Sequence, residues 1–310
     1  MTRILLVGAN GQVGTELQRS LADVGAVTGA TRDGRLADGR PCEVADLDRP
    51  DTLAALVERV APDIVVNAAA HTAVDRAESE PDAAFRANAE APGALAAACA
   101  RHGALLLHYS TDYVFDGRAD RPYRVDDPTA PLGAYGASKL AGEQAVRAAG
   151  GRHLLVRTAW VYAAHGRNFL RTMLRLGAER DALQVVADQV GTPTPAWLIA
   201  DTTATMLRRV TSGAAPHTGT WHLTAAGSTT WHGFAEAIFE GAVARGLLPR
   251  RPRVVPIPTS AYPTPAARPA WSVLDHASLE RDFAVTMPRW QDGLQRVLDR
   301  LGEGRRASSH

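Results

Sequence analysis

The feature that most constrains the fold is a glycine-rich turn close to the start of the chain. Residues 8–14 read GANGQVG, a G-x-x-G-x-x-G motif. The motif follows a short apolar run, RILLVG at 3–8, and opens a segment with helical periodicity. A strand, a glycine turn and a helix in this order let a pyrophosphate approach the backbone and the free N–H groups of a helix N-terminus. The sequence therefore predicts a dinucleotide-binding unit at the start of the chain.

Strand and helix patterns alternate through the first half of the sequence. Apolar runs that predict strands lie at 3–8, 62–70, 104–110 and 153–158, with a weaker run at 41–46. Helical patterns lie between them, at 11–23, 51–60, 81–102 and 135–149. Unbroken apolar strands joined by helices are typical of a parallel sheet that helices cover on both faces. We therefore expect an α/β fold with a doubly wound parallel (Rossmann) sheet.

The regularity ends at about residue 158, and the remaining segments mix short strands, turns and helices. We expect them to form a smaller C-terminal α/β substrate-binding lobe over the carboxyl edge of the sheet, where doubly wound folds bind ligands. The Rossmann domain is predicted to comprise residues 1–158 and about 184–225, and the smaller lobe about 159–183 and 226–300. Residues 303–310 are predicted to form a polar tail.

Charge and cysteine content limit the classes of partner. The formal net charge of +1 argues against nucleic acid or an anionic membrane as a partner of the whole protein. Two cysteines, Cys42 and Cys99, make no disulfide framework and no zinc cluster, so a cytoplasmic protein is expected. No apolar run reaches the roughly 20 residues that cross a bilayer. The expected partner is a small molecule.

A tyrosine and the chain's single lysine lie four residues apart. Lys139 is the one lysine among 34 Lys and Arg residues, and Tyr135 precedes it by one helical turn. A neighbouring ammonium group should lower the pKa of a phenol, which can then give a proton to a carbonyl oxygen. Either Ser110 or Thr111, at the end of the strand 104–110, could share the developing negative charge on that oxygen. The pattern predicts a ketone reductase.

The stretch VTGATRDGR at 27–35, where the second strand of the sheet should end, bears on the choice of cofactor. An acidic residue there holds the ribose 2′-hydroxyl of NAD, whereas an arginine accommodates the 2′-phosphate of NADP. Thr31 and Arg32 occupy this position, which favours NADPH. Asp33 follows directly and keeps NADH possible.

Several longer segments resemble the extended short-chain dehydrogenase/reductases, and among them the dTDP-4-dehydrorhamnose reductase family. The resemblance covers nearly the whole chain, from residue 4 to residue 294. It is most specific in VNAAAHTAVDRAESEP (66–81), HYSTDYVFDG (108–117), YGASKLAGE (135–143), RTAWVYA (157–163), NFLRTMLRL (168–176), DQVGTPT (188–194) and TSAYPTPAARP (259–269). It implies NADPH-dependent reduction of the C4 ketone of a dTDP-linked 6-deoxy-hexulose, giving dTDP-L-rhamnose.

The resemblance also implies roles for individual residues. Tyr135 would donate the proton, Lys139 would position the nicotinamide ribose and tune Tyr135, and Thr111 would polarise the ketone. The implied cofactor contacts are Gly8, Asn10, Gly11, Gln12, Val13, Thr31, Arg32, Asp46, Leu47, Ala68, Ala69, Ala70, Tyr109, Tyr135 and Lys139. The implied substrate contacts are Thr111, Asp112, Tyr135, Trp160, Asn168 and Arg268. Trp221 and Trp231 are expected to be core residues of the smaller lobe.

The chain departs from the family at a metal site. Some members form a dimer bridged by a metal ion that three glutamates hold. Glu16 remains here, but Trp197 and Gln291 occupy the other two positions. One carboxylate is too few for a hard cation. We therefore predict no bridging magnesium and no other metal, and a monomer or a homodimer built without metal.

Three rival functions remain open from the sequence. The closest is 4-keto reduction of another dTDP-deoxy sugar, since the motifs define the ketone better than the hexulose. An epimerase or dehydratase is disfavoured because Thr111-Asp112-Tyr113 lacks the glutamate that a dehydratase needs beside its threonine. A non-catalytic, NADP-binding regulatory subunit is disfavoured because Tyr135, Lys139 and Thr111 are all present.

Overall fold

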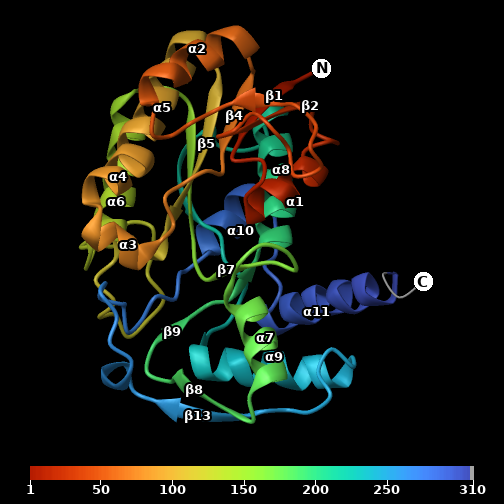
Figure 1. Cartoon of the computed structure of the whole chain (residues 1–310). Coiled ribbons are helices and arrows are strands. Elements are labelled where there is room, and N and C mark those ends of the chain that lie inside the picture. Colours follow the sequence, from red (N-terminus) through yellow and green to blue (C-terminus); the bar gives the residue numbers. More distant parts are fainter. Residues whose placement is uncertain (308–310) are drawn as a thin grey trace.

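A parallel sheet of seven strands forms the centre of the larger lobe (Figure 1). The computed structural model describes residues 1–307. The strands are β1 (Arg3–Val7), β2 (Ala26–Thr31), β3 (Glu43–Val44), β4 (Ile64–Asn67), β5 (Leu105–Thr111), β6 (His153–Thr158) and β11 (Thr218–His222). Their order is β11-β6-β5-β4-β1-β2-β3, and every neighbouring pair is parallel. Strands β2 and β3 are added on one side of β1, and β4 and the later strands on its other side. The carboxyl ends of β1 and β4 therefore form the switch point where such folds bind ligands.

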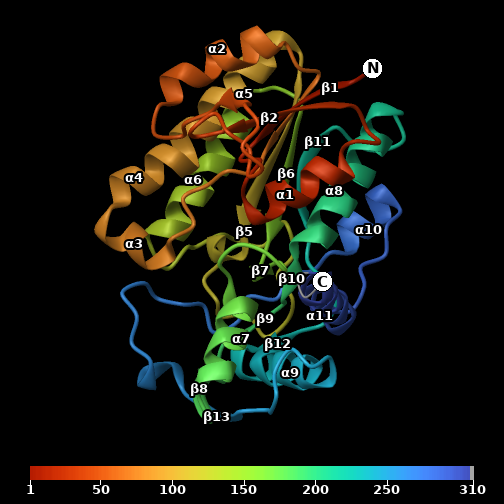
Figure 2. The same ribbon diagram turned by 45° about the vertical axis from the view of Figure 1, so that its right-hand side comes forward.

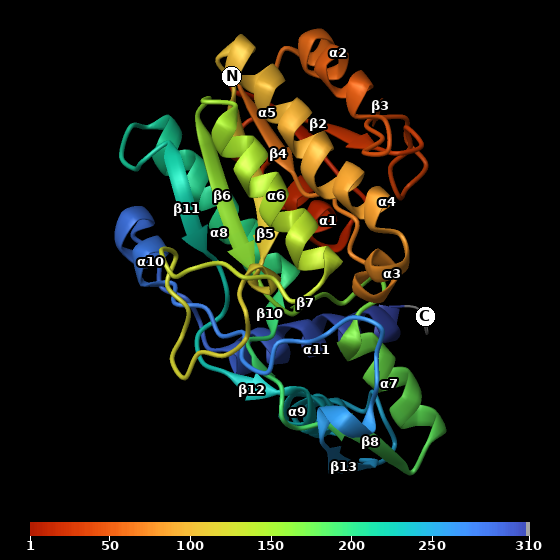
Figure 3. The same cartoon turned by 90° about the vertical axis from the view of Figure 1, so that its left-hand side faces the viewer.

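Helices cover both faces of this sheet, as Figures 1 and 3 show. One face carries α2 (Pro50–Val60), α5 (Ala91–His102) and α6 (Ala134–Ala148), preceded by the short α3 (Val74–Ser79) and α4 (Pro81–Phe85). The other face carries α1 (Gln12–Ser20) and α8 (Ala196–Thr211), with α10 (Ala277–Phe283) beside α8. The predicted doubly wound α/β class is confirmed.

The central strands are buried along their whole length. All seven residues of β5 and all four of β4 are buried, which explains why these segments are unbroken apolar runs rather than alternating ones. The strand predictions at 3–8, 62–70, 104–110 and 153–158 are confirmed. The weaker run at 41–46 contains only the two-residue β3 at the edge of the sheet.

The segment 81–102 is not the single α-helix that its alanine-rich sequence predicts. A π-helical turn, η1 (Arg86–Glu90), separates α4 from α5. At its centre Asn88 is fully buried, accepts a hydrogen bond from the His71 N–H (2.8 Å) and donates to the His71 carbonyl (3.0 Å) and the Ser138 hydroxyl (3.0 Å). The turn therefore ties the loop after β4 to α6, a local constraint that helix periodicity does not reveal.

A smaller lobe lies below the carboxyl ends of the strands (Figure 2). Its helices are α7 (Phe169–Glu179), α9 (Trp231–Ala244) and α11 (Trp290–Ala307). Its strand pairs are β8 (Ala182–Val186) with β13 (Arg253–Ile257), and β9 (Val190–Gly191) with β12 (Thr229–Thr230). A further pair, β7 (Val161–Tyr162) with β10 (Thr194–Pro195), lies where the lobes meet, and the 3₁₀ turns are η2 (Asp112–Val114) and η3 (Thr259–Ala261).

One hydrophobic cluster continues from the sheet into the smaller lobe. It contains Ile4 and Leu107 of the sheet together with Phe234 of α9 and Leu298 of α11. Such a shared core resists relative movement of the lobes, because separation would expose apolar surface to water. Helix α11 includes residues 303–307, which we expected in the tail, and the rest of that predicted tail, 308–310, lies outside the described residues. No helix within residues 1–307 is long and apolar enough to cross a membrane.

Candidate active site

The glycine turn after β1 forms a close-packed anion-binding loop. Gly8 has a φ of 83°, and a Cβ there would collide with the backbone of Ala69 in the loop after β4. A Cβ on Gly14 would collide with the Gly8 carbonyl, so the helix can begin this close to the strand only with glycine at both positions. Gly11 caps α1 without a side chain, which leaves the first N–H groups of that helix available to an anion. The residues present thus fit a dinucleotide pyrophosphate.

This loop opens into a cleft of about 980 Å³ at the switch point. Most of the predicted site residues line the cleft, although they come from seven separate segments of the chain. They are Gly8, Asn10, Gly11, Gln12, Val13, Thr31, Arg32, Leu47, Ala68, Ala69, Ala70, Tyr109, Thr111, Asp112, Tyr135, Lys139 and Trp160. Parallel strands bring them together, because their carboxyl ends meet at one edge of the sheet.

Three predicted residues lie outside this lining. Asp46 pairs with Arg32 at 3.5 Å. Asn168 caps α7 and donates a hydrogen bond to the Gln12 side chain at 2.8 Å, which joins the smaller lobe to the glycine loop. Arg268 pairs with Asp75 of α3 at 2.8 Å, and its buried Nη1 has no hydrogen-bond partner among the described residues. Asn168 and Arg268 therefore lie where the two lobes face each other.

Tyr135 and Thr111 lie together at the wall of the cleft. Both line the cleft, and the Thr111 hydroxyl donates to a carboxylate oxygen of Asp112 at 2.9 Å. Burial raises the pKa of Tyr135 to about 12, and the hydrogen bond with Thr111 only partly offsets this effect. The expectation that Lys139 lowers the pKa of Tyr135 is wrong, because burial and the neighbouring charge of Asp112 raise this pKa.

Lys139 points away from solvent. Its side chain is 2% exposed, and Nζ donates to the Tyr109 carbonyl at 2.6 Å and lies 3.4 Å from Nε2 of His108. Burial lowers the pKa of Lys139 to about 8, while the carboxylate of Glu143 acts in the opposite direction. The lysine therefore changes its charge close to physiological pH.

Asp112 is the second group in the cleft whose pKa is shifted toward neutral pH. It is 2% exposed and follows β5 directly. Burial raises its pKa to about 6, and the hydrogen bond from Thr111 lowers it in part. A buried carboxylate beside a tyrosine and a threonine is typical of a functional site rather than of a core.

The adenosine end of the cleft is polar. Thr31 is 5% exposed, and its hydroxyl donates to the Asp33 carboxylate at 2.9 Å and accepts from the Arg35 N–H at 3.1 Å. The Thr31 side chain thus holds the turn, whereas the Arg32 side chain is 73% exposed and pairs with Asp46 and, at 3.6 Å, with Asp48. Because most of the Arg32 side chain is exposed despite these two ion pairs, its guanidinium is accessible to a phosphate.

A pair of stacked indole rings lines the other end of the cleft. Trp160 has a φ of 47°, and its ring lies parallel to that of Trp231 with centroids 3.5 Å apart. Trp231 lines the cleft instead of being a simple core residue, contrary to our expectation. Trp221 is buried as expected, but it lies in β11 of the central sheet rather than in the smaller lobe. The signal for Trp231 is its position at the first turn of α9, but that position has meaning only once Trp160 is placed opposite.

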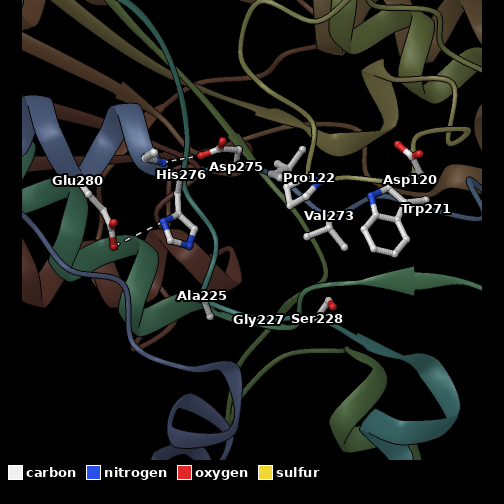
Figure 4. Close-up of a pocket in the computed structure, with 12 residues that line it drawn as sticks. Asp120, Pro122, Ala225, Gly227, Ser228, Trp271, Val273, Asp275, His276 and Glu280 are labelled. Carbon is white, nitrogen blue, oxygen red and sulfur yellow. Dashed lines mark hydrogen bonds and ion pairs between the residues drawn. The ribbon is translucent and has the colours of Figure 1, made fainter.

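A second cavity, of about 340 Å³, shares no lining residue with the cleft. Figure 4 shows His276 and Glu280 paired at its side, 3.5 Å apart. Asp275 accepts a hydrogen bond from the Ala277 N–H at 2.7 Å and thereby holds the start of α10. Two of the three carboxylates around this cavity, those of Asp275 and Glu280, thus already interact with groups of this chain. The third is Asp120, on a surface loop.

The residues around Glu16 do not fit the bridging metal site that the resemblance implies for some related proteins. The carboxylate of Glu16 accepts two hydrogen bonds from Arg300, at 2.9 and 3.1 Å, and Arg19 lies 3.7 Å away. Trp197 lies under the Arg296 guanidinium, 3.9 Å from its ring centroid. Within the described part of the chain, no group of three or more His, Cys, Asp or Glu side chains could hold a metal ion. Arginine side chains thus surround the one remaining glutamate.

Comparison with known sequences assigns the chain to a family. A family model described as the RmlD substrate binding domain matches residues 1–303. The chain is 54% identical over 295 residues to the dTDP-4-dehydrorhamnose reductase of Burkholderia thailandensis, which covers 93% of this chain and 95% of that protein. It is 46% identical over 298 residues to the protein of the same name from Escherichia coli K12, with 96% and 97% covered.

Solved structures of proteins with the same name share the fold of this chain. A dTDP-4-dehydrorhamnose reductase of Clostridium acetobutylicum aligns with a TM-score of 0.86 at 37% identity and covers 96% of this chain and 99% of that one. The protein of that name from Bacillus anthracis, solved in complex with NADP, aligns with a TM-score of 0.86 at 34% identity over the same shares.

Proposed function

The chain belongs to the family of the RmlD substrate binding domain, and from this premise we propose that it reduces the C4 ketone of dTDP-4-dehydro-L-rhamnose to dTDP-L-rhamnose. It is an oxidoreductase that depends on a nicotinamide cofactor. The observation that carries the proposal is the convergence of Tyr135, Lys139 and Thr111 with the glycine loop in one cleft. The names of the full-length relatives support the dTDP-sugar as the substrate.

The protein supplies proton transfer and positioning. The bound nicotinamide supplies the hydride. Tyr135 is the proton donor: a phenol with a pKa of about 12 is protonated throughout the physiological range, and an alkoxide is basic enough to take its proton. Thr111 stabilises the oxygen as charge develops, since its hydroxyl already lies beside that of Tyr135. Lys139 positions the ribose and returns a proton toward Tyr135.

The sugar nucleotide occupies the side of the cleft that the smaller lobe faces. Arg268 offers an unpartnered buried Nη1, which suits a pyrophosphate oxygen. Trp160 provides an aromatic surface at the same end, with Trp231 behind it. Asn168 holds the glycine loop and α7 together, so its role is to keep the two halves of the site in register.

The cofactor is NADPH, with NADH accepted, because Arg32 is the exposed cation at the adenosine end. Replacement of Arg32 by alanine removes a charge-assisted hydrogen bond to the 2′-phosphate, worth about 1.5–3 kcal/mol. We expect KM for NADPH to rise by about 10- to 100-fold and KM for NADH to stay the same. Arg40→Ala, which removes a similarly exposed arginine of the same loop, is the control. An equal rise in both KM values would contradict the assignment.

The decisive test of the function is Tyr135→Phe, assayed as loss of NADPH absorbance with dTDP-4-dehydrorhamnose. Loss of the proton donor should lower kcat by about 10²- to 10⁴-fold, while the Kd for NADPH is unchanged. Tyr162→Phe is a matched control, because none of the described residues gives that buried hydroxyl a hydrogen bond. A Tyr135→Phe enzyme that turns over near the wild-type rate would sink the proposal. Identification of the product sugar separates this reductase from one that makes another dTDP-deoxy sugar.

The same proposal covers location and assembly. We infer a cytoplasmic enzyme, which the two free cysteines, Cys42 and Cys99, support. We infer a monomer or a homodimer without a bridging metal. We also place the boundary between the lobes so that β8 belongs to the smaller lobe, since β8 pairs with β13.

A further inference from the structure

A buried line of three polar side chains leads from the sheet to the catalytic helix. Asn67 ends β4, His108 lies opposite it on β5, and Lys139 projects from α6. Their exposures are 1%, 1% and 2%. The Asn67 amide lies 3.1 Å from Nδ1 of His108, and Nε2 of the same ring lies 3.4 Å from Nζ of Lys139. The three side chains thus contact one another directly and are buried from bulk solvent.

The direction of the hydrogen bonds follows from one backbone group. The N–H of Ala69 can only donate, and it meets Oδ1 of Asn67 at 3.1 Å. The other amide atom, Nδ2, therefore faces His108 and must donate to Nδ1. A neutral His108 must then carry its proton on Nε2, the nitrogen that faces Lys139. Burial, together with the charge of Lys139, lowers the pKa of His108 well below its usual value, so the ring is neutral.

An Nε2–H group is a poor neighbour for an ammonium ion. A charged Lys139 has three donors and no acceptor, so it cannot accept a hydrogen bond from His108. An uncharged amine has a lone pair that can accept it, and it can still donate to the Tyr109 carbonyl at 2.6 Å. The line from Asn67 therefore favours the uncharged form of Lys139.

Other titratable groups lie near Lys139, on its own helix α6 and on strand β5. Tyr135 lies one turn before it and Glu143 one turn after it on α6. Glu143 favours the charged amine, but its carboxylate is engaged by Arg157 of β6 and by Arg147, each at 2.8 Å. From β5, His108 is the titratable group within hydrogen-bond distance of Nζ in the described structure.

We propose that His108, oriented by Asn67, is a positioning residue of the reduction, whose Nε2–H stabilises the amine that Lys139 becomes after returning its proton toward Tyr135. The inference rests on the proposed function. In each turnover Tyr135 gives its proton to the substrate oxygen, and the phenolate regains a proton at the expense of the Lys139 ammonium. A proton that enters from solvent through the cleft, which both residues line, then recharges the amine. No bond of His108 forms or breaks, and the electron pair comes from the cofactor.

The single lysine makes this directly measurable. Protein labelled with ¹³C,¹⁵N-lysine gives one side-chain signal, that of Lys139, whose chemical shifts follow its protonation without cofactor or substrate. In His108→Gln the amide oxygen can accept from the ammonium, so the titration midpoint should rise by about one pH unit. Asn67→Asp should also raise it, because the carboxylate accepts from Nδ1–H and leaves Nε2 as an acceptor. His153→Gln, a buried histidine at the start of β6, should leave it unchanged.

A second measurement needs no substitution. The ¹⁵N shifts of the wild-type histidine rings, with His108 assigned by its absence in His108→Gln, should show a proton on Nε2 and none on Nδ1. An Nδ1–H tautomer, or an unmoved lysine midpoint in folded His108→Gln, overturns the proposal even if the enzyme is active. A moved midpoint in a protein that consumes no NADPH with dTDP-4-dehydrorhamnose overturns the proposed function instead.

Discussion

Burial acts in opposite directions on the two residues that define the site. It raises the pKa of the Tyr135 phenol to about 12 and lowers that of the Lys139 amine to about 8. Both shifts have one cause, because a charge is costly in a poorly hydrated cleft. The site thus holds Tyr135 as a full proton donor while Lys139 can still gain and lose a proton near neutral pH.

Asp112 extends this argument to stability. Its pKa rises from about 4 when the chain is unfolded to about 6 in the folded protein. Between these values the folded state binds more protons, so the free energy of unfolding falls as the pH rises. Asparagine cannot titrate, and we expect Asp112→Asn to be more stable than the wild type at pH 7 by about 1–3 kcal/mol, but not at pH 4. Urea unfolding at both pH values measures this, with Asp120→Asn on the surface as control. An equal gain at both pH values would show that ionisation is not the cause.

The sequence predicted the site residues that follow strand ends or share a helix face. It did not predict residues whose role depends on a contact with a distant segment of the chain. Tyr135, Lys139 and Thr111 were placed in one cleft because strand ends and helix spacing bring them there. The role of Trp231 was missed, because its neighbour Trp160 lies far away along the chain. The pKa of Tyr135 was predicted to be lowered, whereas burial raises it, and burial depends on packing that no local sequence pattern encodes.

Among the elements, α6 is the one whose attachment matters most to the site. Arg157 of β6 and Glu143 of α6 form a two-pronged ion pair, with both distances 2.8 Å and side chains 3% and 0% exposed. The pair lies one turn beyond Lys139 on the same helix. It therefore fixes the helix that carries Tyr135 and Lys139 against the sheet.

Removal of one partner should cost far more than removal of both. Arg157→Met leaves Glu143 buried and takes away its two-pronged partner, and we expect a loss of about 3–5 kcal/mol in the free energy of unfolding. The double variant Arg157→Met, Glu143→Leu buries no charge and should recover most of that loss. Urea unfolding of all three proteins measures the difference. Arg175→Met, which breaks an exposed pair on α7, should change stability by less than about 0.5 kcal/mol. A double variant as unstable as the single one would show that packing of Arg157, rather than charge, holds the helix.

The sequence predicted the strands of the central sheet more accurately than the helices. The runs that became β1, β4, β5 and β6 each contain consecutive apolar residues without alternation, because helices cover both faces of the sheet. The π-helical turn at Arg86–Glu90 was not foreseen, since it exists to bring Asn88 to the His71 backbone. A tertiary requirement overrides helical periodicity there.

In the molecule as a whole, the cleft depends on two lobes that share one core. The cluster that contains Leu107 below the sheet also contains Phe234 and Leu298 of the smaller lobe. Asn168 adds a direct hydrogen bond from the smaller lobe to Gln12 of the glycine loop. We infer that cofactor and substrate bind between surfaces whose spacing is already set, so that binding requires little movement.

Assembly of the molecule should not depend on magnesium. A divalent ion at Glu16 would meet a carboxylate that already accepts two hydrogen bonds from Arg300, with Arg19 close by. A metal that binds the folded state at 100 times its Kd would add about 2.7 kcal/mol to stability. We therefore expect the same sedimentation profile and the same Tm in excess magnesium chloride and in EDTA. A magnesium-dependent dimer, or a Tm that rises with magnesium, would mean that Arg300 leaves Glu16 when a second copy approaches.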